Sequence, residues 1–196
     1  KAVQNIFSGL GQKGKMEIIS AGREPSIETK MGTTRLKLLE AAKNIEGAND
    51  WSFDRALRIA AADLIPREGR KSIVYIGKGL LNHLSFKNYS LIQLADYLKN
   101  NSIDFYTVSL ENIRPADELV FLTEQTGGRG YFLNSPEGIT RIVNDIEGKI
   151  MPIYTLSFIS HSESDFGRKY IKLSSEVTVQ KKSGRDDSGY YAPLRF

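Results

Sequence analysis

The sequence contains no cysteine, which excludes disulfide frameworks, thiol nucleophiles and zinc or iron–sulfur sites built on cysteine. Its two histidines, His83 and His161, are isolated from each other and leave little for a histidine-rich metal site. No apolar run approaches the roughly 20 residues that a membrane-spanning helix needs. What remains is a chain of 196 residues, 40% hydrophobic and 26% charged, which is typical of a single globular domain with a full core.

Charges of both signs are mixed along the chain. Lys and Arg number 27 and Asp and Glu 23, which gives a formal net charge of +4. The nearest approach to a basic cluster, Lys181-Lys182 with Arg185, is followed at once by Asp186-Asp187. Because nucleic-acid binding needs positive charge gathered on one face, we expect no nucleic-acid partner. We interpret residues 181–187 as a solvated turn, with a phosphate-binding patch as the alternative.

Hydrophobic periodicity predicts that strands alternate with helices up to about residue 150. Helical spacing and capping signals predict helices over residues 3–10, 34–45, 53–64, 90–98, 115–126 and 135–146. Short apolar runs predict strands over residues 16–21, 26–31, 72–76, 103–110 and 131–133. This order predicts an α/β fold: a doubly wound, mostly parallel sheet with helices on both faces.

Several helices carry specific expectations. The second should be capped by Thr33 or Thr34 and should bury a stripe formed by Leu36, Leu39, Ala42 and Ile45. The fourth has capping-box spacing at Ser90 and Gln93. In the fifth, Pro115 suits the first turn, and the residues expected to be buried are Leu119, Val120 and Leu122.

The last 45 residues differ in pattern. Tyr154, Leu156 and Phe158 alternate with polar residues, which indicates an antiparallel strand with one wetter face. Residues 170–173 and 177–179 are predicted as further strands. We expect these segments to form a C-terminal antiparallel β extension.

Loops at the carboxyl ends of parallel strands are where such folds bind ligands. In this chain the rule indicates residues 49–52, 77–83 and 109–112. Neither a Gly-x-x-x-x-Gly-Lys-Ser/Thr loop nor a Gly-x-Gly-x-x-Gly loop is present, and there is no Gly-x-Ser-x-Gly elbow. The motifs for nucleotide binding and for serine hydrolysis are therefore missing from these loops.

Four segments carry a resemblance to a known family. They are Arg70-Lys71-Ser72-Ile73-Val74-Tyr75-Ile76 leading into Gly77-Lys78-Gly79, the stretch from Leu122 through Thr126-Gly127-Gly128-Arg129-Gly130 to Phe132, Tyr154-Thr155-Leu156-Ser157-Phe158, and Ser188-Gly189-Tyr190-Tyr191. In order and spacing the chain resembles a von Willebrand factor type A (VWA) domain. The greatest similarity is to the divergent bacterial group in which a β extension follows the domain.

The chain departs from the metal-binding pattern of that family. Members typically hold a divalent cation through Asp-x-Ser-x-Ser, a threonine in a later loop and an aspartate after the fourth strand. The sequence has no Asp-x-Ser-x-Ser, its counterpart of the threonine loop is Asn49-Asp50-Trp51-Ser52, and Lys78 stands where the aspartate is expected. An ammonium about 4 Å from a divalent ion opposes its binding by a few kcal/mol. We therefore predict no metal, with Lys78 neutralising Asp50, meeting an acidic partner or being simply exposed.

The resemblance also implies a strand that the sequence does not contain. In the family, the helix that corresponds to residues 2–10 follows the central strand, which would then lie upstream of Lys1. Omitting a central strand leaves a gap of about 10 Å lined by unpaired backbone groups. We expect a longer intact protein, or a strand from another segment or chain in the gap. The expected organisation is a VWA-like domain over residues 1–151 and a hairpin extension over 152–196 packed on it.

The resemblance implies a non-enzymatic module for protein–protein interaction or adhesion, without a cofactor and without a membrane span in this segment. It further implies export to the bacterial cell envelope, either periplasmic or secreted. The residues predicted to bind the partner are Asn49, Asp50, Trp51, Ser52, Lys78, Asn82 and His83. One alternative is a doubly wound enzyme or small-anion-binding domain that uses the same crevice, with Lys78 as the anion contact. Nucleic-acid binding is a third hypothesis.

Overall fold

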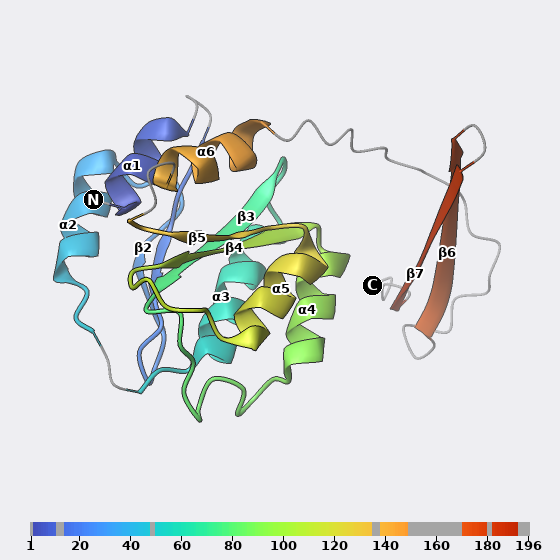
Figure 1. The fold of residues 1–196 in the computed structure, drawn as a ribbon, viewed down its shortest axis with the longest axis horizontal. Helices are drawn as coiled ribbons and strands as arrows, with labels where there is room; N and C mark the ends of the chain where they lie inside the picture. The colour runs from blue at the N-terminus through green and yellow to red at the C-terminus, as the bar shows by residue number, and fades with distance from the viewer. Residues whose placement is uncertain are drawn as a thin grey trace, which may run out of the picture. The chain divides into compact units, whose positions relative to one another are not determined.

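The computed structural model describes residues 2–10, 14–47, 50–134, 138–148, 170–179 and 182–191. The chain divides into two compact units, Lys1–Met151 and Pro152–Phe196, and each is described here by itself (Figure 1). Within the described ranges, none of the helices has the length and hydropathy needed to span a membrane.

The first unit is built on a parallel sheet. Its strands are β3 (Lys71–Gly77), β4 (Ile103–Ser109) and β5 (Gly130–Phe132), in the order β3-β4-β5. Gly77 lies opposite Ser109, and Ser109 lies opposite Phe132, so the three strands end at the same level. This confirms the predicted parallel sheet and brings the loops after the strands to one edge.

Helices cover both faces of this sheet (Figure 1). One face carries α3 (Phe53–Leu64), α4 (Leu91–Asn100) and α5 (Asp117–Thr126); the other carries α1 (Ala2–Gly9) and α6 (Gly138–Gly148). Side chains of β4 pack into the cores on both faces of the sheet, because successive side chains along a strand point to opposite faces. Phe105 belongs to the core under α3, α4 and α5, whereas Val108 packs with Ile6 of α1 and Ile142 of α6. The doubly wound α/β class predicted from the sequence is confirmed.

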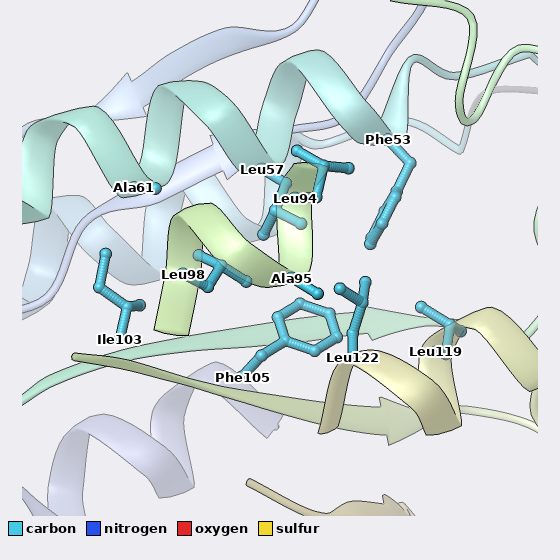
Figure 2. Packing of buried hydrophobic residues seen from close by; sticks show 10 residues of the cluster. All are labelled: Phe53, Leu57, Ala61, Leu94, Ala95, Leu98, Ile103, Phe105, Leu119 and Leu122. Carbon is cyan, nitrogen blue, oxygen red and sulfur yellow. The ribbon is translucent and has the colours of Figure 1, made fainter. Parts of the chain in front are cut away.

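The larger core lies between β4 and the three helices α3, α4 and α5 (Figure 2). Its buried members lie in helices that periodicity predicted, and they include Leu57, Ala61, Leu94, Leu98 and Leu122. The capping box of α4 is present: Gln93 N–H donates to Ser90 Oγ, and Ser90 N–H donates to Gln93 Oε1. These bonds satisfy N–H groups that have no partner inside the helix.

Two expectations about α5 are wrong. The helix begins at Asp117, with Ala116 as its N-cap, so Pro115 precedes the first turn instead of occupying it. Val120 is 37% exposed, whereas the buried positions are Leu119, Leu122 and Thr123. Positions 119, 122 and 123 are three or four residues apart and share one helix face, and position 120 is rotated away from that face.

The inward face of α2 (Arg35–Asn44) also differs from the prediction. Leu38 is its buried residue, and Leu36, placed in the predicted stripe, is 69% exposed. Two residues along a helix correspond to about 200° of rotation, so Leu36 and Leu38 lie on opposite sides. Ile45 is not in the helix, and Thr34 stands at the N-cap without forming a side-chain bond there.

β1 (Ile18–Ser20) and β2 (Ser26–Thr29) form an antiparallel pair of their own. Helix α3 contacts both β1 and β3, yet among the described residues these two strands are not hydrogen-bonded to each other. Helix α3 therefore contacts two sheets, β1-β2 and β3-β4-β5, that are not hydrogen-bonded to each other among the described residues.

A pair of carboxyl groups lies where the segment leading into β1 meets α3. Partial burial, a hydrogen bond with Asp63 and the charge of Asp63 raise the pKa of Glu17 from 4.5 to about 7, and a backbone hydrogen bond with Met31 and the positive charge of Arg67 act in the opposite direction. Glu17 therefore holds a proton in the folded chain at pH values where the unfolded chain has lost it.

We expect thermal stability to decrease as the pH rises from 5 to 8. The folded state binds more protons than the unfolded state between about pH 4.5 and 7, so this contribution is lost as the pH rises through that window. Glu17→Gln, which keeps a donor beside Asp63, should flatten the profile and raise the melting temperature at pH 8. Glu40→Gln, on an exposed position of α2, is the control and should leave the slope unchanged. Equal slopes for Glu17→Gln and the unaltered chain would contradict the carboxyl pair.

The second unit contains an antiparallel hairpin of β6 (Tyr170–Val179) and β7 (Lys182–Tyr191). Residues 170–179 form one strand instead of the two predicted, and Arg185, Asp186 and Asp187 lie in β7, not in a turn. The carboxylate of Asp187 accepts from Arg185 two positions earlier, at 3.1 Å, on the same face of the strand. Cross-strand pairing over ten residues outweighs the low strand propensity of Asp and Gly. The strand predicted at 154–158 and His161 lie outside the described residues.

Candidate functional site

The loops that follow β3 and β4 are held together by backbone hydrogen bonds. Leu110 N–H donates to the Gly77 carbonyl and Ala116 N–H to the Gly79 carbonyl, each at 2.8 Å. Gly79 has φ +83°, and a Cβ there would lie 2.9 Å from the Ser109 hydroxyl. Because only glycine combines this backbone with so close a neighbour, Gly79 fixes the course of the loop that begins at Lys78.

Lys78 presents its ammonium group at this edge. Its side chain is 73% exposed, and Nζ lies 3.6 Å from Oε1 of Glu111, in the loop after β4. Of the three roles considered for Lys78, pairing with Asp50 is not observed, since Asp50 Oδ2 lies 3.7 Å from a guanidinium nitrogen of Arg23. The partner of Lys78 comes from the neighbouring strand's loop because parallel pairing brings the ends of β3 and β4 together. Ion pairs this exposed contribute at most about 1 kcal/mol, so a docking partner can exchange them at little cost.

Two leucines accompany this ion pair. Leu80 is 50% exposed and Leu110 is 41% exposed; Leu110 directly follows β4, and Leu80 stands three residues after the end of β3. We call Lys78, Leu80, Leu110 and Glu111 the carboxyl-end surface. Leu80, Leu110 and Glu111 lie within the loops 77–83 and 109–112 indicated by the sequence, but none of the three was among the residues predicted to bind the partner. The signal that could have found the leucines is a large apolar residue just past a strand, beyond the last position that the sheet can bury.

The threonine-loop counterpart is largely occupied by contacts within the chain. Ser52 is buried; its N–H donates to the Gly22 carbonyl at 3.1 Å and its hydroxyl to the Arg23 carbonyl at 2.9 Å. Trp51 is half-buried and packs against the larger core. Asn49 lies outside the described residues. Of this segment, Asp50 is the residue whose side chain is substantially accessible, at 43%.

Asn82 and His83 begin the turn that leads toward α4. Asn82 Oδ1 accepts from Leu84 N–H at 3.1 Å and from the Ser85 hydroxyl at 2.9 Å, so this side chain shapes the turn. His83 is exposed. Of the two predicted partner-binding residues, His83 is thus the one presented to solvent.

A residue that the sequence reasoning missed fixes this turn. Asp54, in the first turn of α3, is fully buried. Its Oδ2 accepts from Asn88 N–H at 2.6 Å and from Tyr89 N–H at 3.0 Å, and its Oδ1 accepts from Arg55 N–H at 2.7 Å. A buried carboxylate is tolerated when backbone donors surround it. An acidic residue two positions after Ser52, in the first turn of a predicted helix, was the available signal.

The described residues offer little to a metal ion. Within those ranges, no group of three or more His, Cys, Asp or Glu side chains is close enough to hold one. At the end of β3, the side chain that points to solvent is a cation, Lys78.

Comparison with known proteins supports the fold. No protein-family model matches the chain, and no curated protein matches it. Among solved structures, the SpRpn10 VWA domain matches with a TM-score of 0.56 and 20% identity, over 74% of this chain and 79% of that one. An aerotolerance-related membrane protein from Bacteroides fragilis NCTC 9343 matches with a TM-score of 0.55 and 12% identity, over 75% and 83%.

A third solved structure matches nearly the whole chain. It is a von Willebrand factor type A protein from Catenulispora acidiphila, with a TM-score of 0.61 and 9% identity. The match covers 97% of this chain and 49% of that one, so this chain spans about half of that protein's length. At these identities the likenesses show the fold, which is that of a divergent VWA-like domain, as the sequence resemblance indicated.

Proposed function

We propose that the α/β unit is a non-enzymatic module that binds a partner protein through the carboxyl-end surface, without a bridging divalent cation. The observation that carries the proposal is the pair of exposed leucines, Leu80 and Leu110, beside the Lys78–Glu111 ion pair. Full burial of a leucine side chain is worth roughly 1.5–3 kcal/mol, so two leucines supply an apolar centre for an interface. The neighbouring charges then select a partner by their signs.

The cation at position 78 supports docking without a metal ion. Lys78 Nζ carries a positive charge at the end of β3, where a bridging divalent ion would need oxygen ligands, and an ammonium cannot ligate a cation. The Lys78 ammonium can instead pair directly with a carboxylate of the partner protein, and its ion pair with Glu111 is then either kept or replaced. Titration calorimetry with Mg²⁺, Ca²⁺ and Mn²⁺ should therefore give no binding heat.

We further propose that the protein acts in the bacterial cell envelope. Two observations support this: the sequence resemblance to the divergent bacterial VWA group, and the structural likeness to a protein described as an aerotolerance-related membrane protein. Protein interaction as the mode of action agrees with the VWA fold, whose known role in that family is partner binding.

A photo-crosslinking group at Leu110 tests the surface directly. Irradiation in an extract of the source organism should give one discrete adduct, and its yield should be the same with and without EDTA. Lys78→Glu should lower the yield about tenfold or more, as expected when a central interface charge is reversed. Lys43→Glu makes the same change in net charge at an exposed position on α2 and should leave the yield unchanged.

Three results would contradict the proposal. Loss of the adduct in EDTA, or micromolar metal binding abolished by a substitution at residues 77–79, would establish a metal bridge. Equal losses for Lys78→Glu and Lys43→Glu would show that net charge, and not this surface, governs the contact.

A further inference from the structure

A hollow of about 280 Å³, which we call the β5 hollow, lies along strand β5. Its described lining is Arg129, Gly130, Tyr131 and Phe132, together with Arg141 of α6, the helix that packs on β5. Successive residues of a strand turn their side chains to opposite faces, so four residues in a row can line one hollow only along the edge of the strand. The β5 hollow therefore lies at the edge that faces away from β4.

The backbone of β5 presents hydrogen-bond donors to this edge. Thr107 N–H donates to the Arg129 carbonyl at 3.1 Å, so that carbonyl faces β4. Leu133 N–H donates to a carbonyl of β4 at 2.9 Å and faces the same way. Neighbouring residues of a strand direct their backbone groups to opposite sides. The N–H groups of Gly130 and Phe132 therefore point away from β4, toward the β5 hollow.

Arg129 has guanidinium donors to offer a ligand. Its side chain is 59% exposed, and its Nη1 lies 3.9 Å from Asp145 Oδ2, which is beyond hydrogen-bond distance. That oxygen already accepts a hydrogen bond from the Tyr131 hydroxyl. The ion pair with Asp145 thus keeps the guanidinium beside the β5 hollow, and the N–H groups of Arg129 remain available.

Arg141 brings a second guanidinium group from a different element. It is an exposed residue of α6 and lines the same hollow. The described lining contains no Asp or Glu, whereas the Lys78 ammonium lies 3.6 Å from Glu111. A guanidinium offers a planar fork of N–H groups that matches the oxygens of a phosphate or carboxylate. Two such groups without an acid in the described lining favour an oxyanion as the ligand.

We propose that the β5 hollow binds the phosphate group of a small phosphorylated molecule. Its two guanidinium groups and the N–H groups of Gly130 and Phe132 offer more donors than a carboxylate can accept, whereas a phosphate monoester presents three terminal oxygens and a charge of about −1.5 to −2. A volume of about 280 Å³ is just below the range for drug-sized ligands and suits a phosphate with few further atoms. The β5 hollow shares no residue with the carboxyl-end surface, so this proposal does not rest on the proposed function.

Backbone amide shifts measured by NMR on the 196-residue chain test the site. The probe is inorganic phosphate at constant ionic strength and about pH 7.5, where most of it is doubly charged. The amides of Gly130 and Phe132 should shift along a saturating curve with a Kd of about 1 mM or lower. Glycerol phosphate should bind at least as tightly, and acetate about tenfold more weakly. Shifts that do not saturate by roughly 20 mM phosphate, or equal affinities for acetate and phosphate, would overturn the proposal.

Arg129→Gln and Arg141→Gln should each weaken phosphate binding about tenfold, because each removes charge-assisted hydrogen bonds. Arg114→Gln is the control: it makes the same change in net charge at a side chain that is 83% exposed and paired with Asp117, and it should leave the Kd unchanged. If Arg129→Gln does not fold, the exposed Arg141→Gln decides. Equal losses in all three variants would show a response to net charge alone and overturn the site. A phosphoserine peptide that binds more than about tenfold tighter than glycerol phosphate would overturn the small-molecule assignment in favour of a phosphorylated protein.

Discussion

Gly128→Ala is expected to destabilise the α/β unit by about 3–5 kcal/mol, at the upper end of single substitutions. A Cβ at Gly128 would overlap the carbonyl oxygen of Phe105 and lie 2.6 Å from its carbonyl carbon. Both atoms belong to the backbone of β4, and Phe105 is fully buried in the larger core (Figure 2). Neither can move without breaking the pairing of β4 with β3, so the turn between α5 and β5 cannot accept a side chain there.

Alanine substitutions at two further glycines, Gly127 and Gly47, should cost less stability than Gly128→Ala and so provide a ranking to test. Gly127 ends α5 with φ +79° but has no atom closer than 3.9 Å to a built Cβ, so Gly127→Ala costs only backbone strain of about 1–2 kcal/mol. Gly47 has neither a positive φ nor a neighbour within 4 Å, and Gly47→Ala should be neutral or stabilising by about 0.5 kcal/mol. Urea unfolding followed by circular dichroism should rank the three in this order. A cost below about 1 kcal/mol for Gly128→Ala would contradict the close approach to Phe105.

The sequence was sufficient to predict those features for which the local residue pattern and the burial in the folded chain agree. The helix at 53–64, the capping box at Ser90 and the end of the helix predicted over 115–126 depend on spacing along a single segment, and the structure has all three. The parallel direction of β3, β4 and β5 followed from the alternation of strands and helices, because right-handed crossovers join parallel strands.

Features that depend on long-range neighbours were not predictable in the same way. The sequence gives α2 several apolar positions, and the decision to bury Leu38 instead of Leu36 comes from how the helix is rotated on β1 and β2. Many acidic residues along the sequence could pair with Lys78. Glu111 is its partner because β3 and β4 end side by side, with Gly77 opposite Ser109. Asn82 looked like a free loop side chain, but its amide oxygen is used in the turn.

Asp54→Ala should cost about 3 kcal/mol, because it removes a fully buried carboxylate that accepts hydrogen bonds from three backbone N–H groups. The donors are those of Arg55, Asn88 and Tyr89, and two of them lie more than thirty residues from Asp54. The substitution should therefore do more than lower global stability. Amide exchange at Asn88 and Tyr89 should accelerate beyond the change seen in the β4 amides, since the turn loses its attachment to α3.

The matched control is Asp96→Ala, an acidic residue on the exposed side of α4, which should change stability by less than about 0.5 kcal/mol. Asp54→Asn separates charge from shape: the amide keeps one acceptor oxygen but turns its nitrogen toward N–H donors, so it should recover only part of the loss. If Asp54→Ala were no more costly than Asp96→Ala, the turn would be held by something other than this carboxylate. If instead the turn loosens while crosslinking at Leu110 is unchanged, the segment with Asn82 and His83 contributes little to docking. Partner binding would then lie with the ends of β3 and β4, which Asp54 does not touch.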